Sequence, residues 1–172
     1  IHNEYIKKIM KIIYIAETSL TNRSAYTHHV IKMCDAFQKK TGVNLIIPHI
    51  KKKQNFNQLR NNFLLTAKNK FLIKSILNFR MNNFFYRILF GYKTAKYLKG
   101  EKFKMIISRS LMSSIFLILF KIKHILEIHT ELKGFTKFLM INCNFINSKY
   151  IKKIILISKS LNNKFPSISK GK

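Results

Sequence analysis

Short, continuously apolar runs alternate along the chain with longer segments in which apolar residues recur every three or four positions. The run at residues 11–16 is apolar and rich in β-branched side chains, which predicts a strand buried on both faces, as in a parallel sheet. Residues 24–40 carry apolar side chains at helical spacing, and Gly42 is suited to end that helix. A second apolar strand is predicted at 43–48, so residues 11–48 have the size of a right-handed strand–helix–strand crossover.

The same alternation continues along the rest of the chain. We expect further strands at residues 71–76, 104–108, 125–129 and 154–158, although the first of these fits a helix nearly as well. Helices are expected at 84–99, closed by Gly100, and at 111–120, 133–145 and 158–165, with a loop and a short helix at 50–62. This order of elements predicts an α/β protein with a Rossmann-like, doubly wound parallel sheet and helices on both faces.

The length of 172 residues favours one domain. We assign residues 10–165 to this domain, because Met10 begins the more natural opening MKIIYIAE. Residues 1–9 are then an N-terminal extension, and residues 166–172 form a tail that leads toward a further domain. The first residues do not have the pattern of a signal peptide, and the apolar segment 111–120 is shorter than the ~20 residues that span a bilayer.

The chain is strongly basic, with 33 Lys and Arg residues against 6 Asp and Glu and a formal net charge of +27. Such a charge is typical of proteins that bind nucleic acid or anionic membranes. Lys, Ile, Asn and Phe, all with AT-rich codons, make up half of the chain, whereas Arg, which suits bidentate phosphate contacts, is scarce. We therefore attribute much of the lysine excess to an AT-rich bacterial genome and expect no specific nucleic-acid partner. The alternative is a basic, non-catalytic module that binds anionic membrane or nucleic acid, and it requires basic residues clustered on one face.

The two cysteines, Cys34 and Cys143, lie far apart and form no CxxC motif. This spacing predicts neither a disulfide framework nor a zinc site, and it is typical of a reducing compartment. Cys34 falls in the apolar stripe of the helix at 24–40 and is expected in the core.

Polar residues follow most of the predicted strands. In open parallel sheets ligands bind beyond the carboxyl ends of the strands, so these residues are candidates for a site. They are Glu17, Thr18, Ser19, Arg23 and Ser24 after the first strand, Arg109 after 104–108, His129 and Glu131 at the end of 125–129, and Ser158 at the end of 154–158. The first loop lacks both GxGxxG and GxxxxGKS/T, which argues against a dinucleotide site, a P-loop, and other doubly wound proteins such as flavodoxin-like enzymes.

The helix after the first loop begins at Ser24, which is either an N-cap alone or also part of an anion site with Ala25 and free backbone N–H groups. Of the two histidines in its first turns, His29 borders the apolar stripe and His28 is rotated outward. A packing or surface role is expected of each. Adjacent positions diverge on a helix, so this pair predicts no metal site.

His129 ends an otherwise apolar strand and is followed at once by polar residues. It is either a hydrogen-bonded core residue or a functional group whose pKa suits proton transfer near neutral pH. Glu127 lies two residues earlier on the same side of the strand, where it either orients the imidazole or pairs with a lysine. Glu131 is a second candidate carboxylate.

Residues 10–48, MKIIYIAETSLTNRSAYTHHVIKMCDAFQKKTGVNLIIP, are similar to the opening of retaining GT-B glycosyltransferases of family 4, also called group 1. The similarity continues in MIISRS, ILEIHTE and IILISKSL, in that order, and covers most of residues 10–165. Its most specific pieces are SAYTHHV, the strand-end His129 and the ISKSL turn. His29, followed by Val30, fits the place of the family's histidine on this helix. Most members have a glycine pair in the first loop, where this chain has NRSA.

The resemblance implies the acceptor-binding N-terminal half of a GT-B enzyme. Such an enzyme transfers a hexose, with retention, from a nucleotide-sugar to a glycan or lipid-linked acceptor in cell-envelope polysaccharide biosynthesis. His129 would be the catalytic residue near the reacting centre. The cleft would be lined by Glu17, Thr18, Ser19, Arg23, Ser24, Ala25, Tyr26, His29, Arg109, Glu131 and Ser158.

The resemblance also implies a C-terminal domain that holds the nucleotide-sugar and carries an E-x7-E motif, which these residues lack. The nucleotide-sugar is then a co-substrate rather than a tightly bound cofactor, and no metal is expected. A fragment or truncated gene product of this kind should be inactive alone. The implied location is cytoplasmic, peripheral at the inner face of the cell membrane, with Lys51–Lys53 and the aromatic stretch 84–90 as the contacting residues.

Overall fold

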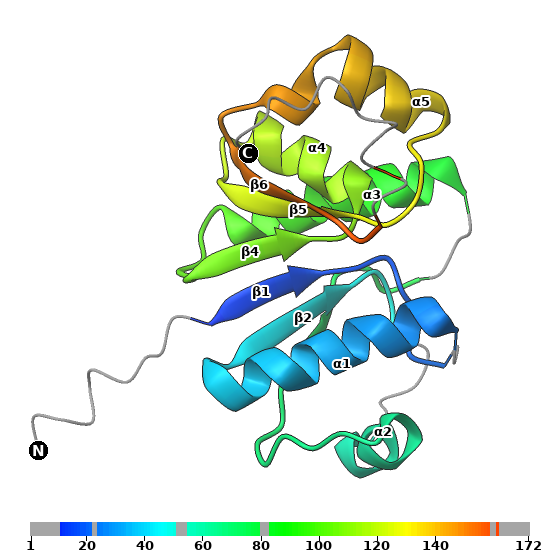
Figure 1. Ribbon diagram of the computed structural model, residues 1–172, viewed down its shortest axis with the longest axis vertical. Helices are drawn as coiled ribbons and strands as arrows, with labels where there is room; N and C mark the ends of the chain where they lie inside the picture. Colours follow the sequence, from blue (N-terminus) through cyan, green and yellow to red (C-terminus); the bar gives the residue numbers. More distant parts are fainter. Residues whose placement is uncertain (1–10, 22–23, 51–54, 80–82, 159–160, 162–172) are drawn as a thin grey trace, which may run out of the picture.

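The structure, a computed structural model, describes residues 11–21, 24–50, 55–79, 83–158 and 161 (Figure 1). The expected N-terminal extension, the tail at 166–172, almost all of the helix expected at 158–165, and the candidate residues Arg23 and Lys51–Lys53 lie outside these ranges. Within them, no helix is both long and apolar enough to cross a bilayer.

The described strands form one parallel sheet. They are β1 (Ile12–Ile15), β2 (Val43–Ile47), β3 (Leu72–Ser75), β4 (Met105–Ser108), β5 (His124–Ile128) and β6 (Ile151–Leu156). Their order across the sheet is β3-β2-β1-β4-β5-β6, and every neighbouring pair is parallel. This confirms the predicted Rossmann-like, doubly wound α/β fold. The direction in which the chain adds strands reverses between β1 and β4, so the loops after these two strands diverge and leave a crevice at the carboxyl edge.

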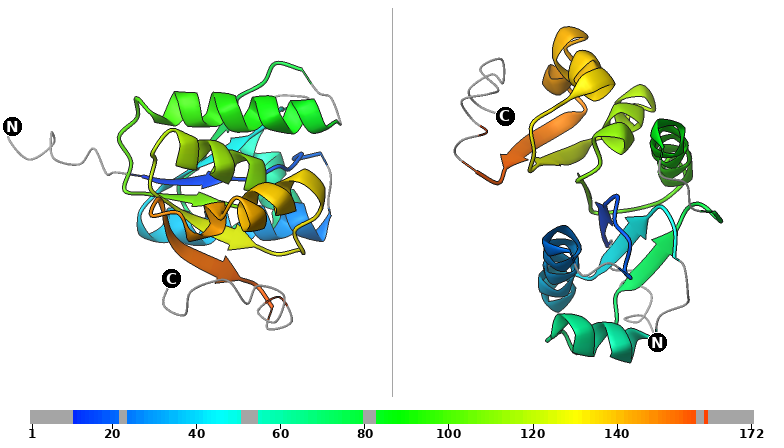
Figure 2. Two further views of the ribbon diagram at one scale, coloured as in Figure 1. Left: turned by 90° about the horizontal axis from the view of Figure 1, so that it is seen from above. Right: turned by 90° about the vertical axis from the view of Figure 1, so that its right-hand side faces the viewer.

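Helices cover both faces of this sheet (Figure 2). They are α1 (Ala25–Lys40), α2 (Phe56–Phe63), α3 (Phe84–Leu98), α4 (Leu111–Leu119) and the short α5 (Gly134–Lys137). Side chains of α1 and α2 pack with Tyr14 and Leu45 on one face, whereas those of α3 pack with Ile13 and Ile15 on the other. Burial on both sides explains why the central strand β1 is apolar at every position, with all four residues buried.

The two ends of α1 follow the predicted local chemistry. The hydroxyl of Ser24 accepts a hydrogen bond of 3.2 Å from the backbone N–H of Thr27, so Ser24 is the N-cap. At the other end Gly42 has a φ of +79°, a left-handed conformation that favours glycine after a helix.

Two predicted boundaries are wrong. Strand β6 begins at Ile151 rather than at 154, because Ile151 already pairs with His124 of β5. The exposed Lys152 and Lys153 interrupt the apolar run, so the sequence pattern does not indicate where this strand begins. Lysines are common on such an edge strand. The helix expected at 133–145 is instead the short α5, a π-helical turn (Phe138–Asn142) and a 3₁₀ turn (Phe145–Asn147), interrupted by Asn144 in a left-handed conformation.

Helices α3 and α4 approach closely at Gly91, where a Cβ atom would lie 2.8 Å from the Cδ2 atom of Phe116 and 2.9 Å from the carbonyl oxygen of Met112. Replacing Gly91 with alanine should force the helices apart and lower the free energy of unfolding by about 2 kcal/mol, despite alanine's higher helix propensity. Gly100→Ala is the matched control, because nothing lies within 4 Å of its added Cβ. Urea unfolding measures both variants, and equal stabilities would contradict this close packing.

His124, at the start of β5, is buried and held as a neutral ring. Its Nδ1 atom lies 3.0 Å from the carbonyl oxygen of Ile122, and its Nε2 atom lies 2.6 Å from the hydroxyl of Ser114. Because a carbonyl can only accept, Nδ1 carries the proton and Nε2 accepts the hydroxyl hydrogen of Ser114. Burial lowers the pKa of His124 to about 4, although the hydrogen bond to Ile122 acts in the opposite direction.

This histidine should make stability depend on pH. Between its ordinary pKa of 6.5 and about 4, the unfolded chain binds a proton at this ring and the folded chain does not. Lowering the pH across this window should therefore reduce the free energy of unfolding by about 3 kcal/mol. Urea unfolding at several pH values tests this, and a His124→Gln variant should lack that part of the slope. The same pH dependence in both proteins would contradict the assignment.

Candidate functional site

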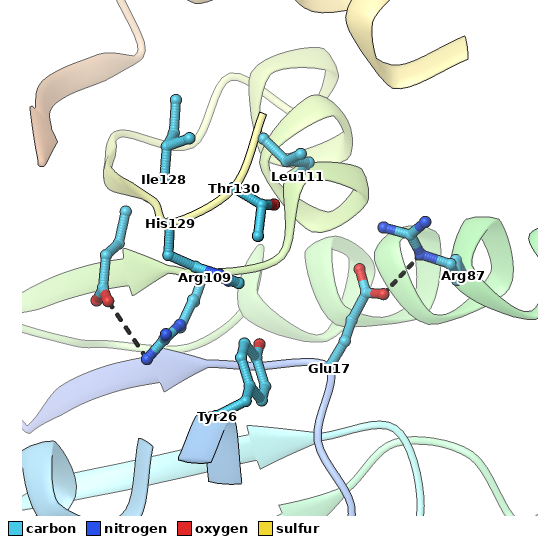
Figure 3. A pocket seen from close by; sticks show the side chains of 9 residues that line it. Glu17, Tyr26, Arg87, Arg109, Leu111, Ile128, His129 and Thr130 are labelled. Atoms are coloured by element: carbon cyan, nitrogen blue, oxygen red, sulfur yellow. Dashed lines mark hydrogen bonds and ion pairs between the residues drawn. The ribbon is translucent and has the colours of Figure 1, made fainter. Parts of the chain in front are cut away.

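A pocket of about 220 Å³ opens at the carboxyl edge of the sheet, beside the point where the strand order reverses (Figure 3). Its walls come from the loops after β1, β4 and β5 and from the first turns of α1, α3 and α4. The lining residues are Glu17, Tyr26, Arg87, Arg109, Leu111, Glu127, Ile128, His129 and Thr130. Four of these, Glu17, Tyr26, Arg109 and His129, are residues that the sequence predicted for the site.

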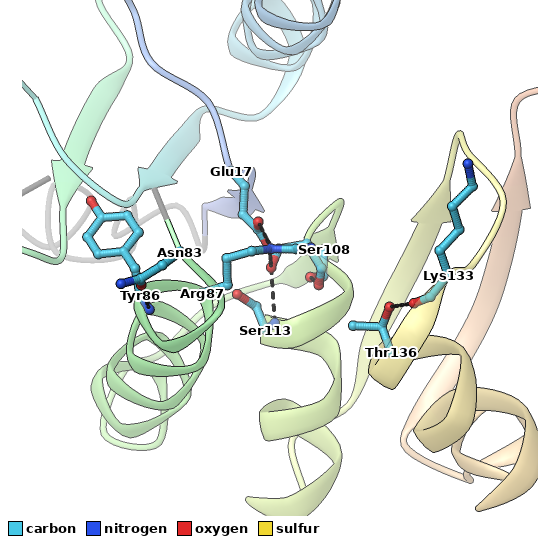
Figure 4. A network of polar contacts seen from close by, with 9 residues as sticks. Glu17, Asn83, Tyr86, Arg87, Ser108, Ser113, Lys133 and Thr136 are labelled. Atoms are coloured by element: carbon cyan, nitrogen blue, oxygen red, sulfur yellow. Dashed lines mark hydrogen bonds and ion pairs between the residues drawn. The ribbon is translucent and has the colours of Figure 1, made fainter. Parts of the chain in front are cut away.

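Glu17, just after β1, joins three elements at the mouth of the pocket (Figure 4). One carboxylate oxygen lies 2.6 Å from Nε of Arg87 on α3, and the other accepts a hydrogen bond of 2.6 Å from the hydroxyl of Ser110. Ser110 is itself the N-cap of α4, where its hydroxyl accepts from the backbone N–H of Ser113. Glu17 therefore fixes the starts of α3 and α4 relative to the end of β1.

Arg109 is the buried cation of the pocket, with 7 % of its surface exposed. Its Nη1 atom lies 3.4 Å from Oε1 of Glu127, and its guanidinium carbon lies 4.4 Å from the centre of the Tyr26 ring. Among the described residues, the Nε and Nη1 atoms of Arg109 have no hydrogen-bond partner. A buried guanidinium with unused donors that lines a pocket is suited to bind an oxygen-rich ligand.

Glu127 lies under the pocket as its buried anion. The hydroxyl of Tyr14 on β1 donates a hydrogen bond of 2.7 Å to Oε2, while Oε1 lies 3.4 Å from both His29 and Arg109. Burial raises the pKa of the Tyr14 phenol, and the neighbouring Glu127 adds to that shift. Tyr14 therefore stays protonated and serves as a donor. The sequence predicted that Glu127 would either orient His129 or pair with a lysine. Its contacts in the structure are instead with Tyr14, His29 and Arg109.

His129 directly follows β5, one residue beyond the strand, and is half-buried in the wall of the pocket. Its ring centre lies 5.0 Å from that of Tyr26. Burial lowers the pKa of His129, and Arg109 lowers it further, while Glu127 acts in the opposite direction. The imidazole is thus neutral at neutral pH and is suited to hydrogen-bond a hydroxyl or to take up a proton.

The other predicted residues lie outside the lining of this pocket. Thr18 is buried and bonded to the hydroxyl of Thr27 at 2.6 Å, and Ser19 contacts Thr21. Ser24 caps α1, Ala25 is exposed at its start, and His29, although not in the lining, contacts the lining residue Glu127. Glu131 and Ser158 are exposed on loops after β5 and β6. His28 packs its ring 5.8 Å from Phe63, in line with the packing role expected of it.

Sequence reasoning missed Arg87 and Tyr14. Arg87 is separated by 70 residues from its partner Glu17, and only its place in the first turn of a helix that starts at the carboxyl edge signals its role. Tyr14 stands in an apolar strand, where its hydroxyl was the only sign of a polar partner. Among the described residues no group of three or more His, Cys, Asp or Glu side chains is arranged to hold a metal ion.

The chain was compared with known proteins. No protein-family model matches it, and a search of curated proteins also gives no match. The assignment of function therefore depends on the fold, on the residues of the pocket and on the resemblance described above.

Proposed function

We propose that this chain is the acceptor-side half of a GT-B glycosyltransferase that transfers a sugar from a nucleotide-sugar to a glycan or lipid-linked acceptor. The observation that carries the proposal is the position of His129, which borders a pocket at the reversal of strand order together with Arg109 and Tyr26. These are positions that the family resemblance assigns to the cleft. The nucleotide-sugar would be held mainly by a second domain.

In this proposal the pocket residues act on the transferring sugar and its acceptor. The neutral imidazole of His129 hydrogen-bonds a hydroxyl of the sugar or stabilises charge that develops near it. Arg109 offers buried N–H donors to an oxygen of the substrate, and Tyr14 and Glu127 hold that guanidinium in place. The mechanism needs no bound metal.

The spread of the basic residues favours this proposal over a basic, non-catalytic binding module. Exposed lysines occur on α1 and α3, which cover opposite faces of the sheet, on the edge strand β6, and between α4 and β5. They include Lys39, Lys40, Lys93, Lys96, Lys121, Lys123, Lys152 and Lys153. A binding module would gather them on one face, whereas a composition shaped by an AT-rich genome distributes them.

The experiment is to sequence the gene beyond the codon for Lys172. The proposal expects an open frame of roughly another domain, about 150 residues, with an E-x7-E motif in it. A stop codon at that point, with no neighbouring gene for a donor-binding domain, would overturn the proposed enzyme and leave the basic binding module.

A further inference from the structure

Four phenylalanine side chains are exposed together at the carboxyl edge of the molecule, and we call them the aromatic patch. They are Phe84, Phe85, Phe135 and Phe138, with 40, 76, 51 and 52 % of their surfaces exposed. By contrast Tyr86 and Phe90, also on α3, are buried. Of the aromatic side chains in the stretch 84–90, only Phe84 and Phe85 therefore face outward. Burial of a phenylalanine side chain is favoured over exposure to water by roughly 1.5–3 kcal/mol. A contiguous group of exposed phenylalanines therefore marks an interaction surface.

The patch is continuous although its residues come from distant parts of the chain. The Phe84 ring centre lies 6.2 Å from that of Phe85 and 5.5 Å from that of Phe135 on α5, which in turn lies 6.5 Å from Phe138. The start of α3 and the segment around α5 thus form one apolar surface.

Two exposed lysines lie near this surface, and the candidate site lies beside it. The exposed Lys133 and Lys137 flank Phe135 along the chain. Arg87, which lines the mouth of the pocket, follows Phe84 and Phe85 on α3. A surface that combines exposed aromatic rings with cationic side chains is typical of proteins that lie on anionic lipid membranes.

The geometry points to the aromatic patch as a docking surface for an anionic lipid bilayer, with its rings at the headgroup level and Lys133 and Lys137 near the lipid phosphates. This inference rests on the proposed function and narrows its acceptor class: the acceptor is membrane-anchored and enters the pocket from the bilayer side. An anionic bilayer is complementary to a chain of net charge +27, whereas a second copy of the chain would be repelled. A single-stranded nucleic acid is disfavoured because the rings pack edge to face or against one another instead of presenting separate stacking platforms.

The absence of tryptophan from the sequence allows a site-specific test. A Phe85→Trp variant carries one fluorophore in the patch, and a Leu119→Trp variant carries one at another exposed apolar site, 56 % exposed at the far end of α4. With vesicles that mix phosphatidylglycerol and phosphatidylcholine, emission from the Phe85→Trp protein should shift to shorter wavelength and that from Leu119→Trp should not. No shift at position 85, or equal shifts at both positions, would overturn the inference.

Vesicle co-sedimentation distinguishes binding through the aromatic patch from attraction by the net positive charge of the chain. The triple variant Phe85→Ser, Phe135→Ser, Phe138→Ser should bind these vesicles about 100-fold more weakly than the unchanged chain. The matched control Lys99→Gln, Lys102→Gln, Lys104→Gln removes three exposed charges at the opposite edge and should weaken binding less than about threefold. Circular dichroism checks that each variant folds, and Phe85→Ser alone serves if the triple variant does not. If the patch and control variants lose vesicle binding equally, the binding is non-specific electrostatic attraction and the inference is overturned.

Other partners are outcomes of the same experiments. If patch variants keep vesicle binding but no longer form a dimer, or no longer bind single-stranded RNA, the patch binds that partner instead of a bilayer. Either result would overturn the inference. In a longer protein with the second domain, unchanged vesicle binding after Phe85→Ser would overturn the inference, as expected if that domain covers the patch. If the protein does not bind vesicles but transfers sugar to a water-soluble acceptor, this inference is overturned and the proposed function stands.

Discussion

Under the proposed glycosyltransferase function, replacing His129 with alanine in a protein that includes the donor-binding domain should lower kcat by about 10²- to 10⁴-fold, the range for loss of a positioned acid–base or charge-stabilising group. The side chain is half-buried in the pocket wall at the carboxyl end of β5, so its loss leaves a gap rather than a disturbed core. Substrate binding should change little, because Arg109 and the loop after β1 remain. Release of nucleoside diphosphate during sugar transfer measures the effect.

His28→Ala is the matched control for this prediction, because that histidine lies on α1 away from the pocket and packs against Phe63. It should keep kcat within about twofold, since surface changes away from a site have small effects.

In the unchanged protein, the rate should also fall as the pH drops through the lowered pKa of His129, because protonation removes the neutral imidazole. An unchanged rate in the His129→Ala protein would exclude this residue from catalysis.

Replacing Glu127 with alanine should lower the free energy of unfolding by about 4 kcal/mol, because it leaves the buried Arg109 without its anionic partner. The change also removes the acceptor for the hydroxyl of Tyr14, a second buried polar group. Urea unfolding followed by circular dichroism measures the loss. Glu101→Ala, at an exposed glutamate, is the control and should stay within about 0.5 kcal/mol of the unchanged chain.

A double-mutant cycle identifies the cause of this loss. If the unpaired guanidinium dominates, Arg109→Met should recover part of the stability lost in a Glu127→Ala chain, because no buried charge then lacks a partner. Losses that simply add would contradict the coupling between the two side chains.

The fold was predictable because its central strands are buried on both faces. The strands β1, β2 and β4 are mostly apolar, with only Asn44 in β2 and Ser108 at the end of β4 as exceptions, so the sequence indicates strands of a parallel sheet buried on both faces. The edge strand β6 was harder, since Lys152 and Lys153 face water and interrupt its apolar run. The segment after α5 was read as a helix because its apolar residues have helical spacing, yet a left-handed Asn144 breaks it.

From the residues alone, the site was predictable only where a residue follows a strand; Tyr26, on α1, came from the family resemblance. Glu17 lies two residues after β1, and Arg109 and His129 come directly after β4 and β5; the carboxyl ends of parallel strands meet at one edge. The partner residues were not predictable, because Arg87 reaches Glu17 across 70 residues of sequence and Tyr14 reaches Glu127 across 113. The actual partners of Glu127 likewise depend on how α1 crosses the sheet, which no local pattern encodes.

The most direct test of the account is an assay of sugar transfer by the complete protein. Labelled uridine, guanosine and adenosine diphosphate sugars would be supplied together with membranes from the source cells. We expect label from at least one donor to enter a membrane-anchored product, and we expect His129→Ala to abolish this incorporation while His28→Ala preserves it. No incorporation from any donor by a folded protein, or equal incorporation by the His129→Ala protein, would contradict the proposed glycosyltransferase.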